Sequence, residues 1–159
     1  MLYASLKAVH LLAVIAWVGG MFFMLMCLRP AVHEVLEAPP RVRLMHATLR
    51  RFLRIVGLAV LAILLSGAAM FAMAWRDRAG AGLAFNMPLD WYVMVALFFV
   101  MLAVFLHVRL PLFARVERAM AAQAWPDAGA ALGAIRWEVA INLVLGIFIV
   151  VIVRLGAAA

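Results

Sequence analysis

The sequence predicts an all-α integral membrane protein, a four-helix bundle that crosses a lipid bilayer. Hydrophobic residues make up 70% of the 159-residue chain and charged residues only 13%, against roughly half and a quarter in soluble domains. The chain holds four apolar runs, each close to the ~20 residues that a spanning helix needs. These runs leave no room for a separate soluble domain, so residues 1–159 are expected to form a single four-span domain.

The expected spans follow one another with short connections. They lie near residues 6–28, 55–75, 91–110 and 136–154. The first run is longer than the roughly 7–15 apolar residues of a signal-peptide core, and no small-residue cleavage site follows it, which indicates a retained span. Pro30 predicts that the first helix ends or bends there, Pro40 suits the first turn of the next helix, and Pro111 is expected to kink the third.

The arginines predict the orientation of the bundle. Most of them lie between spans one and two or between spans three and four, whereas the opposite side has only Lys7, Arg76, Arg78 and Arg154. The positive-inside rule then gives an up-down topology with both termini on the outer (periplasmic) side of a bacterial inner membrane. The net charge of +7 therefore indicates topology and contact with anionic lipids, and no nucleic-acid partner is expected.

His10 is the first candidate ligand, because an ionisable ring inside an apolar span is costly unless it faces a partner. At 1.5 Å per residue it lies about 6 Å inside the outer boundary, a depth similar to that of Met70, Met73 and Met94. Imidazole with thioethers suits Cu(I), and a His–Met pair also serves as an axial pair for haem iron. Alternatively, the methionines only fill the core, and His10 only forms a hydrogen bond to a carbonyl or serine of a neighbouring helix.

A second polar level is expected closer to the cytoplasm. His107, Glu138 and Asn142 come out at comparable depths on spans three and four. A His–Glu pair there could carry a proton or hold a cation, and the alternative is that Glu138 pairs with Arg136 or Arg109. His107 lies about 20 Å deeper than His10, so the two histidines cannot both bind one haem iron.

Other motifs are few. His33 and His46, with Glu34 and Glu37 nearby, could bind a divalent ion outside the bilayer, but surface histidines in basic connections are expected to be solvated. Cys27 is the only cysteine, which excludes an intramolecular disulfide and a cysteine-based metal site. The sequence has no phosphate-binding glycine loop, zinc-protease motif or nucleophile elbow, so a soluble hydrolase or nucleotide-binding enzyme is not supported.

A set of residues in the first two spans matches a known pattern. His10 is followed by Trp17, Gly19-Gly20, Phe22-Phe23 and Arg29-Pro30, and Arg50-Arg51-Phe52 leads into a second span with Ser66-Gly67. This pattern resembles the CopD (copper resistance protein D) superfamily of small four-helix membrane proteins and its relatives, the HemJ-type protoporphyrinogen oxidases. His10 stands where the family has its histidine.

The two branches imply different chemistry. Resemblance to the CopD group implies an inner-membrane protein of copper uptake or tolerance, and resemblance to the HemJ group implies haem b and redox work on porphyrin. HemJ-type proteins require a lysine early in the third span after a tryptophan. Here Trp91 is followed by Tyr92, Val93, Met94 and Val95, which disfavours that oxidase chemistry.

The sequence thus favours copper handling through an outer-side metal site formed by His10 with Met70, Met73 or Met94. The main alternative is a haem b membrane protein, linked to quinone or porphyrin, with His10, Trp17 and Met94 around the haem. The third alternative is a non-catalytic structural subunit of a membrane complex. A protein without enzymatic activity is favoured, and an enzyme would be a haem-dependent membrane oxidoreductase. The expected partners are the bilayer, a periplasmic copper-binding protein and a second copy of the chain.

Overall fold

The described part of the chain, residues 1–84 and 86–156, consists of four long helices and contains no strand in a computed structural model. Each of the four is long and apolar enough to cross a membrane. The first consists of α1 (Leu2–Val14), η1 (Ile15–Gly19), α2 (Gly20–Phe23), η2 (Met24–Leu28) and α3 (Arg29–Val35); the second is α4 (Pro40–Gly80); the third consists of α5 (Leu89–His107), η3 (Val108–Leu112) and α6 (Phe113–Ala121); the fourth is α7 (Trp125–Gly156). The predicted all-α four-helix membrane fold is confirmed.

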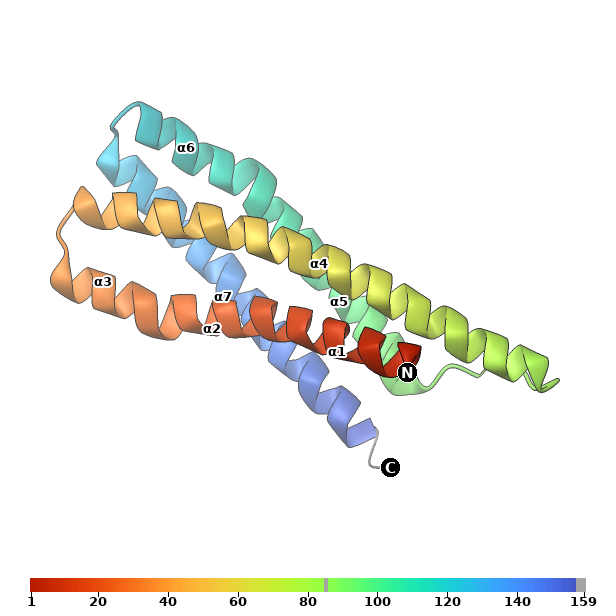
Figure 1. Cartoon of the computed structure of the whole chain (residues 1–159). Helices are drawn as coiled ribbons and strands as arrows, with labels where there is room; N and C mark the ends of the chain where they lie inside the picture. The colour runs from red at the N-terminus through yellow and green to blue at the C-terminus, as the bar shows by residue number, and fades with distance from the viewer. Residues whose placement is uncertain (85, 157–159) are drawn as a thin grey trace.

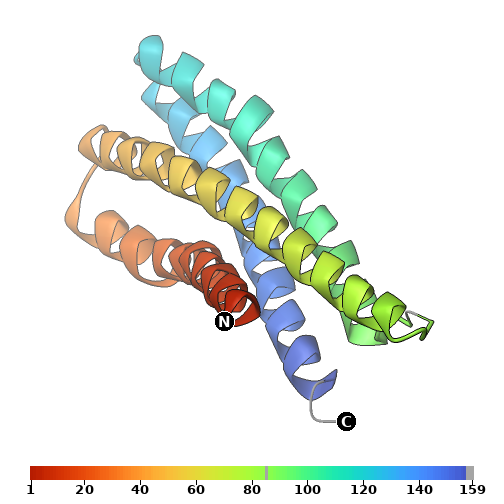
Figure 2. The same cartoon turned by 45° about the vertical axis from the view of Figure 1, so that its right-hand side comes forward.

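The helices form two layers and run alternately up and down (Figures 1 and 2). In the first layer α1 packs along α4, and in the second layer α5 and α6 pack along α7. The N-terminus, the C-terminal end of α7 and the α4–α5 connection lie at one end of the bundle, which we call the terminal end. The α3–α4 and α6–α7 connections lie at the other, which we call the turn end.

The first helix keeps one face in the core by including π turns. Its buried residues Ala13, Trp17, Met21 and Met24 include two successive intervals of four residues, more than the 3.6 residues of an α-helical turn. A π turn takes up an extra residue, and η1 lies within this stretch. The π turn therefore keeps the four side chains pointed at the same neighbours.

Two prolines are accommodated without ending their helices. Pro30 lies in the first turn of α3, directly after η2, and the helix continues to Val35, so the first helix does not end at Pro30. Pro111 lies within η3. A wider π turn re-pairs backbone groups that the missing proline N–H leaves open. Pro40 begins α4, as predicted.

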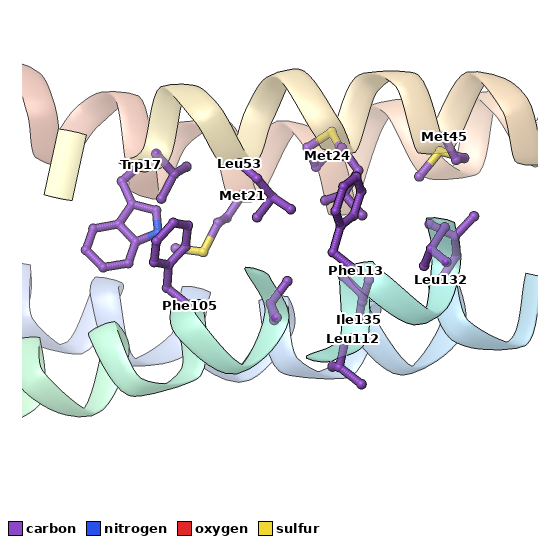
Figure 3. Packing of buried hydrophobic residues seen from close by; sticks show 14 of the residues in the cluster. Trp17, Met21, Met24, Met45, Leu53, Phe105, Leu112, Phe113, Leu132 and Ile135 are labelled. Atoms are coloured by element: carbon purple, nitrogen blue, oxygen red, sulfur yellow. The ribbon is translucent and has the colours of Figure 1, made fainter. Parts of the chain in front are cut away.

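The core lies between the two layers (Figure 3). Trp17 is 3% exposed and packs edge-on against two rings of α5, with centroid distances of 6.4 Å to Phe98 and 6.1 Å to Phe105. Further along, Met24 and Met45 of the first layer face Leu132 and Ile135 of α7. Large apolar side chains are also exposed along all four helices, as expected for surfaces that contact lipid.

Gly146 lies at a close contact between α7 and the first helix. A Cβ atom placed there would lie 2.9 Å from Cγ2 of Val18 and 3.2 Å from Cε of Met101. Small residues at helix contacts are typical of membrane bundles, in which packing rather than burial from water holds helices together.

We expect Gly146→Leu to destabilise the bundle by about 1–3 kcal/mol, because the added side chain has to displace Val18 or separate the layers. Thermal unfolding in detergent micelles should show a lower midpoint. Gly133→Leu on the same helix is the matched control, since a Cβ at Gly133 meets nothing within 4 Å. Equal effects of the two substitutions would contradict this account of Gly146.

Candidate functional site

His10 lies where α1 packs on α4, and its partner is Ser66. The His10 Nδ1 atom is 3.0 Å from the Ser66 Oγ atom, and Ser66 is only 3% exposed. The hydrogen bond joins two helices inside the apolar part of the bundle. The alternative that His10 forms a hydrogen bond to a serine of a neighbouring helix is thus what the structure shows.

The direction of this hydrogen bond determines the tautomer of His10. The Ser66 hydroxyl donates to backbone carbonyls of its own helix, those of Ala62 and Ile63. Its single proton is then used, so Oγ accepts and the Nδ1–H of His10 donates. This assignment places the ring proton on Nδ1 and leaves the lone pair of Nε2 for another partner.

Gly67 provides the surface on which the ring lies. A Cβ at this position would stand 3.4 Å from Cε1 and 3.7 Å from Nδ1 of His10. The absence of a side chain lets the imidazole lie directly against α4. Ser66 and Gly67 together hold the ring in one orientation, as hydrogen-bonding partners do for histidines that bind metals.

Met70 and Met73 extend the same stripe of α4. They follow Ser66 by four and seven residues, a spacing that places all three on one helix face. Both methionines are partly buried, and both lie closer than Ser66 to the terminal end, because α4 ends there. Their thioethers are therefore the soft donors of α4 that follow the contact between Ser66 and His10.

Met94 lies at a similar depth on another helix. The contacts of Trp17 with Phe98 and Phe105 fix the relative level of the first helix and α5. Toward the terminal end, His10 lies seven residues, about two turns, from Trp17. Met94 lies four residues from Phe98 and eleven from Phe105, which places it at a similar level. Met94 is partly buried, and the structure records no contact between its side chain and His10.

Other residues predicted for this site have different surroundings. Trp17 belongs to the aromatic core described above, which accounts for its burial by packing. Within residues 1–84 and 86–156, no group of three or more His, Cys, Asp or Glu side chains could hold a metal ion. Cys27 and Met26 are exposed and point away from the core. A metal at His10 would therefore rely on thioethers.

The second polar level consists of the pair His107 and Glu138, with Asn142 nearby. The His107 Nδ1 atom lies 3.2 Å from Oε1 of Glu138. No ion pair of the described residues joins Glu138 to Arg109 or Arg136, and Arg136 instead stacks over the Trp137 ring at 4.8 Å. The structure thus brings His107 and Glu138 together across α5 and α7.

Asn142 completes this level from one turn further along α7. It is 3% exposed, and its Oδ1 atom has no hydrogen-bond partner. Asn142 and Glu138 line a cavity of about 20 Å³ together with Trp17 and Phe105. That volume is enough for a single water molecule.

His46 differs from the expectation of a solvated histidine. It is 8% exposed and stacks on Phe113 with a centroid distance of 5.5 Å. Its Nε2 atom is 3.4 Å from Arg50 and 3.7 Å from Glu117, and Arg50 and Glu117 form an ion pair of 2.8 Å. Burial and the charge of Arg50 lower the pKa of His46, while Glu117 opposes this shift. The cluster joins α4 to α6; the sequence did not predict it because the two segments are 67 residues apart.

The fold and its polar groups define a multi-pass α-helical membrane protein. Residues 46–155 match the model of the family copper resistance protein D. This match covers more than two thirds of the chain, and the chain belongs to the CopD family. The family indicates a role in copper resistance or uptake. The matched segment does not include His10. No curated protein and no solved structure matches the chain.

We expect Asn142→Leu to raise the thermal unfolding midpoint in detergent, by an amount equivalent to about 1 kcal/mol. A buried acceptor without a partner costs about 1–3 kcal/mol, and leucine of similar size removes it. Asn86→Leu, at an exposed position, is the control and should have little effect. A lower midpoint for Asn142→Leu would mean that this amide has a stabilising partner, such as a water in the cavity.

Proposed function

We propose that this CopD-family protein binds Cu(I) at its terminal end, with His10 Nε2 and the thioethers of Met70 and Met73 as ligands. The observation that carries the proposal is the hydrogen bond between His10 Nδ1 and Ser66, which leaves Nε2 available as a ligand. Copper is the cargo in this proposal, and the site is where it enters the bundle from a copper-binding protein on the outer side.

The donor set favours a monovalent soft ion. Imidazole and thioethers are neutral, and they match the preference of Cu(I) for nitrogen and sulfur. The described residues offer no carboxylate cluster, which a divalent ion would need to balance its charge in a medium of low dielectric. A single positive charge costs less to desolvate, so neutral ligands suffice for Cu(I).

Further donors lie along the route toward the turn end. Met94, at the depth of His10, would join the site when α5 approaches α1. Met21, Met24 and Met101 are all buried, so a thioether path would run through the core, and the exposed Met26 and Cys27 would not contribute to it.

We expect His10→Ala and the double variant Met70→Leu/Met73→Leu each to weaken Cu(I) binding by more than about tenfold. The measurement is a competition titration of purified protein against a coloured Cu(I) chelator under reducing conditions. Ser66→Ala should weaken binding less, because it removes only the group that orients the ring. Met26→Leu is the control, at a methionine that is 58% exposed, and should bind as the natural sequence does.

Two results would contradict the copper site. Unchanged binding in His10→Ala and in the double methionine variant would leave His10 with a packing role only, as in a structural subunit. A Soret band in the purified protein that disappears in His10→Ala would assign the same nitrogen to haem b and favour the redox alternative.

We also propose that the terminal end faces the periplasm, because the basic connections at the turn end should stay in the cytoplasm. Alkaline phosphatase fused after residue 156 should therefore be active. The same enzyme inserted in the α3–α4 connection, residues 36–39, should be inactive. The reverse pattern would place His10 on the cytoplasmic side and overturn the route of entry.

A further inference from the structure

Three arginines from three helices meet at the turn end of the bundle. Arg29 begins α3, Arg41 lies in the first turn of α4, and Arg136 is on α7. Arg29 and Arg136 line one cavity of about 30 Å³ between the first helix, α4 and α7. Arg29 and Arg41 are partly buried, and Arg136 is exposed. We call these three residues the arginine cluster.

The cluster has no acidic partner among the described residues. The ion pairs of residues 1–84 and 86–156 involve His46, Arg50 and His107 with Glu117 or Glu138, and none includes the arginine cluster. Glu34 and Glu37, the acids nearest in sequence to Arg29 and Arg41, are exposed. Glu138, two residues from Arg136, is paired with His107. Like charges therefore face one another without compensation.

The arginines are close enough to affect one another. Burial, and then the charges of Arg136 and Arg41, lower the pKa of Arg29. His33, also on α3, has a lowered pKa because of burial and all three arginines. Guanidinium groups stay protonated in proteins, so the cluster keeps its charge and its mutual repulsion. A bound anion would remove that repulsion.

The cluster lies at the level of lipid headgroups. On the first helix, residues 8–28 carry no charge between Lys7 and Arg29, a length of roughly 30 Å that equals the hydrocarbon thickness of a bilayer. The rest of the cavity is apolar, with Met24, Leu132 and Ile135 in its wall. An anion at this position has positive charge on one side and hydrocarbon on the other.

We propose that the arginine cluster binds the phosphate group of an anionic phospholipid in the leaflet at the turn end. Guanidinium groups bind phosphate oxygens in bidentate fashion and with charge-assisted hydrogen bonds. A phospholipid fits better than free phosphate, because the apolar wall below the arginines would contact its acyl chains. Such a lipid would join the first helix to α7 through the arginine cluster.

The test is lipid binding by the full chain, and it is independent of copper. Purified protein is reconstituted in nanodiscs containing equal parts of phosphatidylglycerol and phosphatidylcholine, and the lipids that stay bound on transfer to detergent are identified by native mass spectrometry. We expect selective retention of one phosphatidylglycerol. Arg29→Gln/Arg136→Gln should reduce that retention at least tenfold, since two charged hydrogen-bond donors are lost.

The matched control is Arg51→Gln/Arg54→Gln, which removes the same charge from exposed positions of α4. It should keep the selective retention. Equal losses in the two double variants would overturn the proposal in favour of diffuse attraction between arginines and anionic lipids. Displacement of the retained lipid by millimolar inorganic phosphate would assign the cluster to a free anion and overturn the lipid assignment.

Thermal unfolding with and without anionic lipid gives a second measurement of lipid binding. In neutral detergent without anionic lipid, Arg41→Gln should leave the thermal unfolding midpoint unchanged or raise it, because it removes a charge that repels Arg29. Added phosphatidylglycerol should raise the midpoint of the natural sequence and not that of Arg29→Gln/Arg136→Gln. A lower midpoint of Arg41→Gln without lipid would show that Arg41 has a partner within the protein and would contradict the proposal.

Discussion

Within the apolar part of this bundle, a polar side chain has to find its partner inside the protein, because lipid offers none. His10 meets this requirement through Ser66, and His107 meets it through Glu138. Asn142 meets it only in part, since its Oδ1 has no partner. This constraint determines which helix faces must touch, and it selects the places where chemistry is possible. A group whose second polar atom is still open, such as His10 Nε2, is the one that can accept a ligand.

Depth could be predicted from the sequence, but lateral neighbours could not. The rise per residue and the run lengths gave four helices and placed His107 level with Glu138, because both follow from helix geometry alone. The same arithmetic treats every helix as straight and identical, so it has no means of finding η1, which shifts the face of the first helix. It also could not choose Ser66 as the partner of His10, since that contact depends on how α1 and α4 rotate about their axes. The burial of His46 was missed for the same reason.

The two ends of the molecule differ in the chemistry that they present. The candidate site toward the terminal end consists of imidazole and thioethers, and the arginine cluster at the turn end has no acidic partner among the described residues. Membership of the CopD family indicates copper resistance or uptake for the chain as a whole. An ion that passes from one end to the other would move from neutral donors toward a region of positive potential, which an anionic lipid at the arginine cluster would reduce.

The length of α4 has a mechanical consequence. It contains 41 residues without a break, about twice the length needed to cross the hydrocarbon, and it carries Ser66 within the bundle and His46 near its beginning. About 30 Å separates these two residues along one rigid rod. Any tilt or rotation that moves Ser66 away from His10 therefore also moves His46 relative to Phe113. The helix behaves as a lever, so a ligand that fixes one of its ends reduces the motion available to the other.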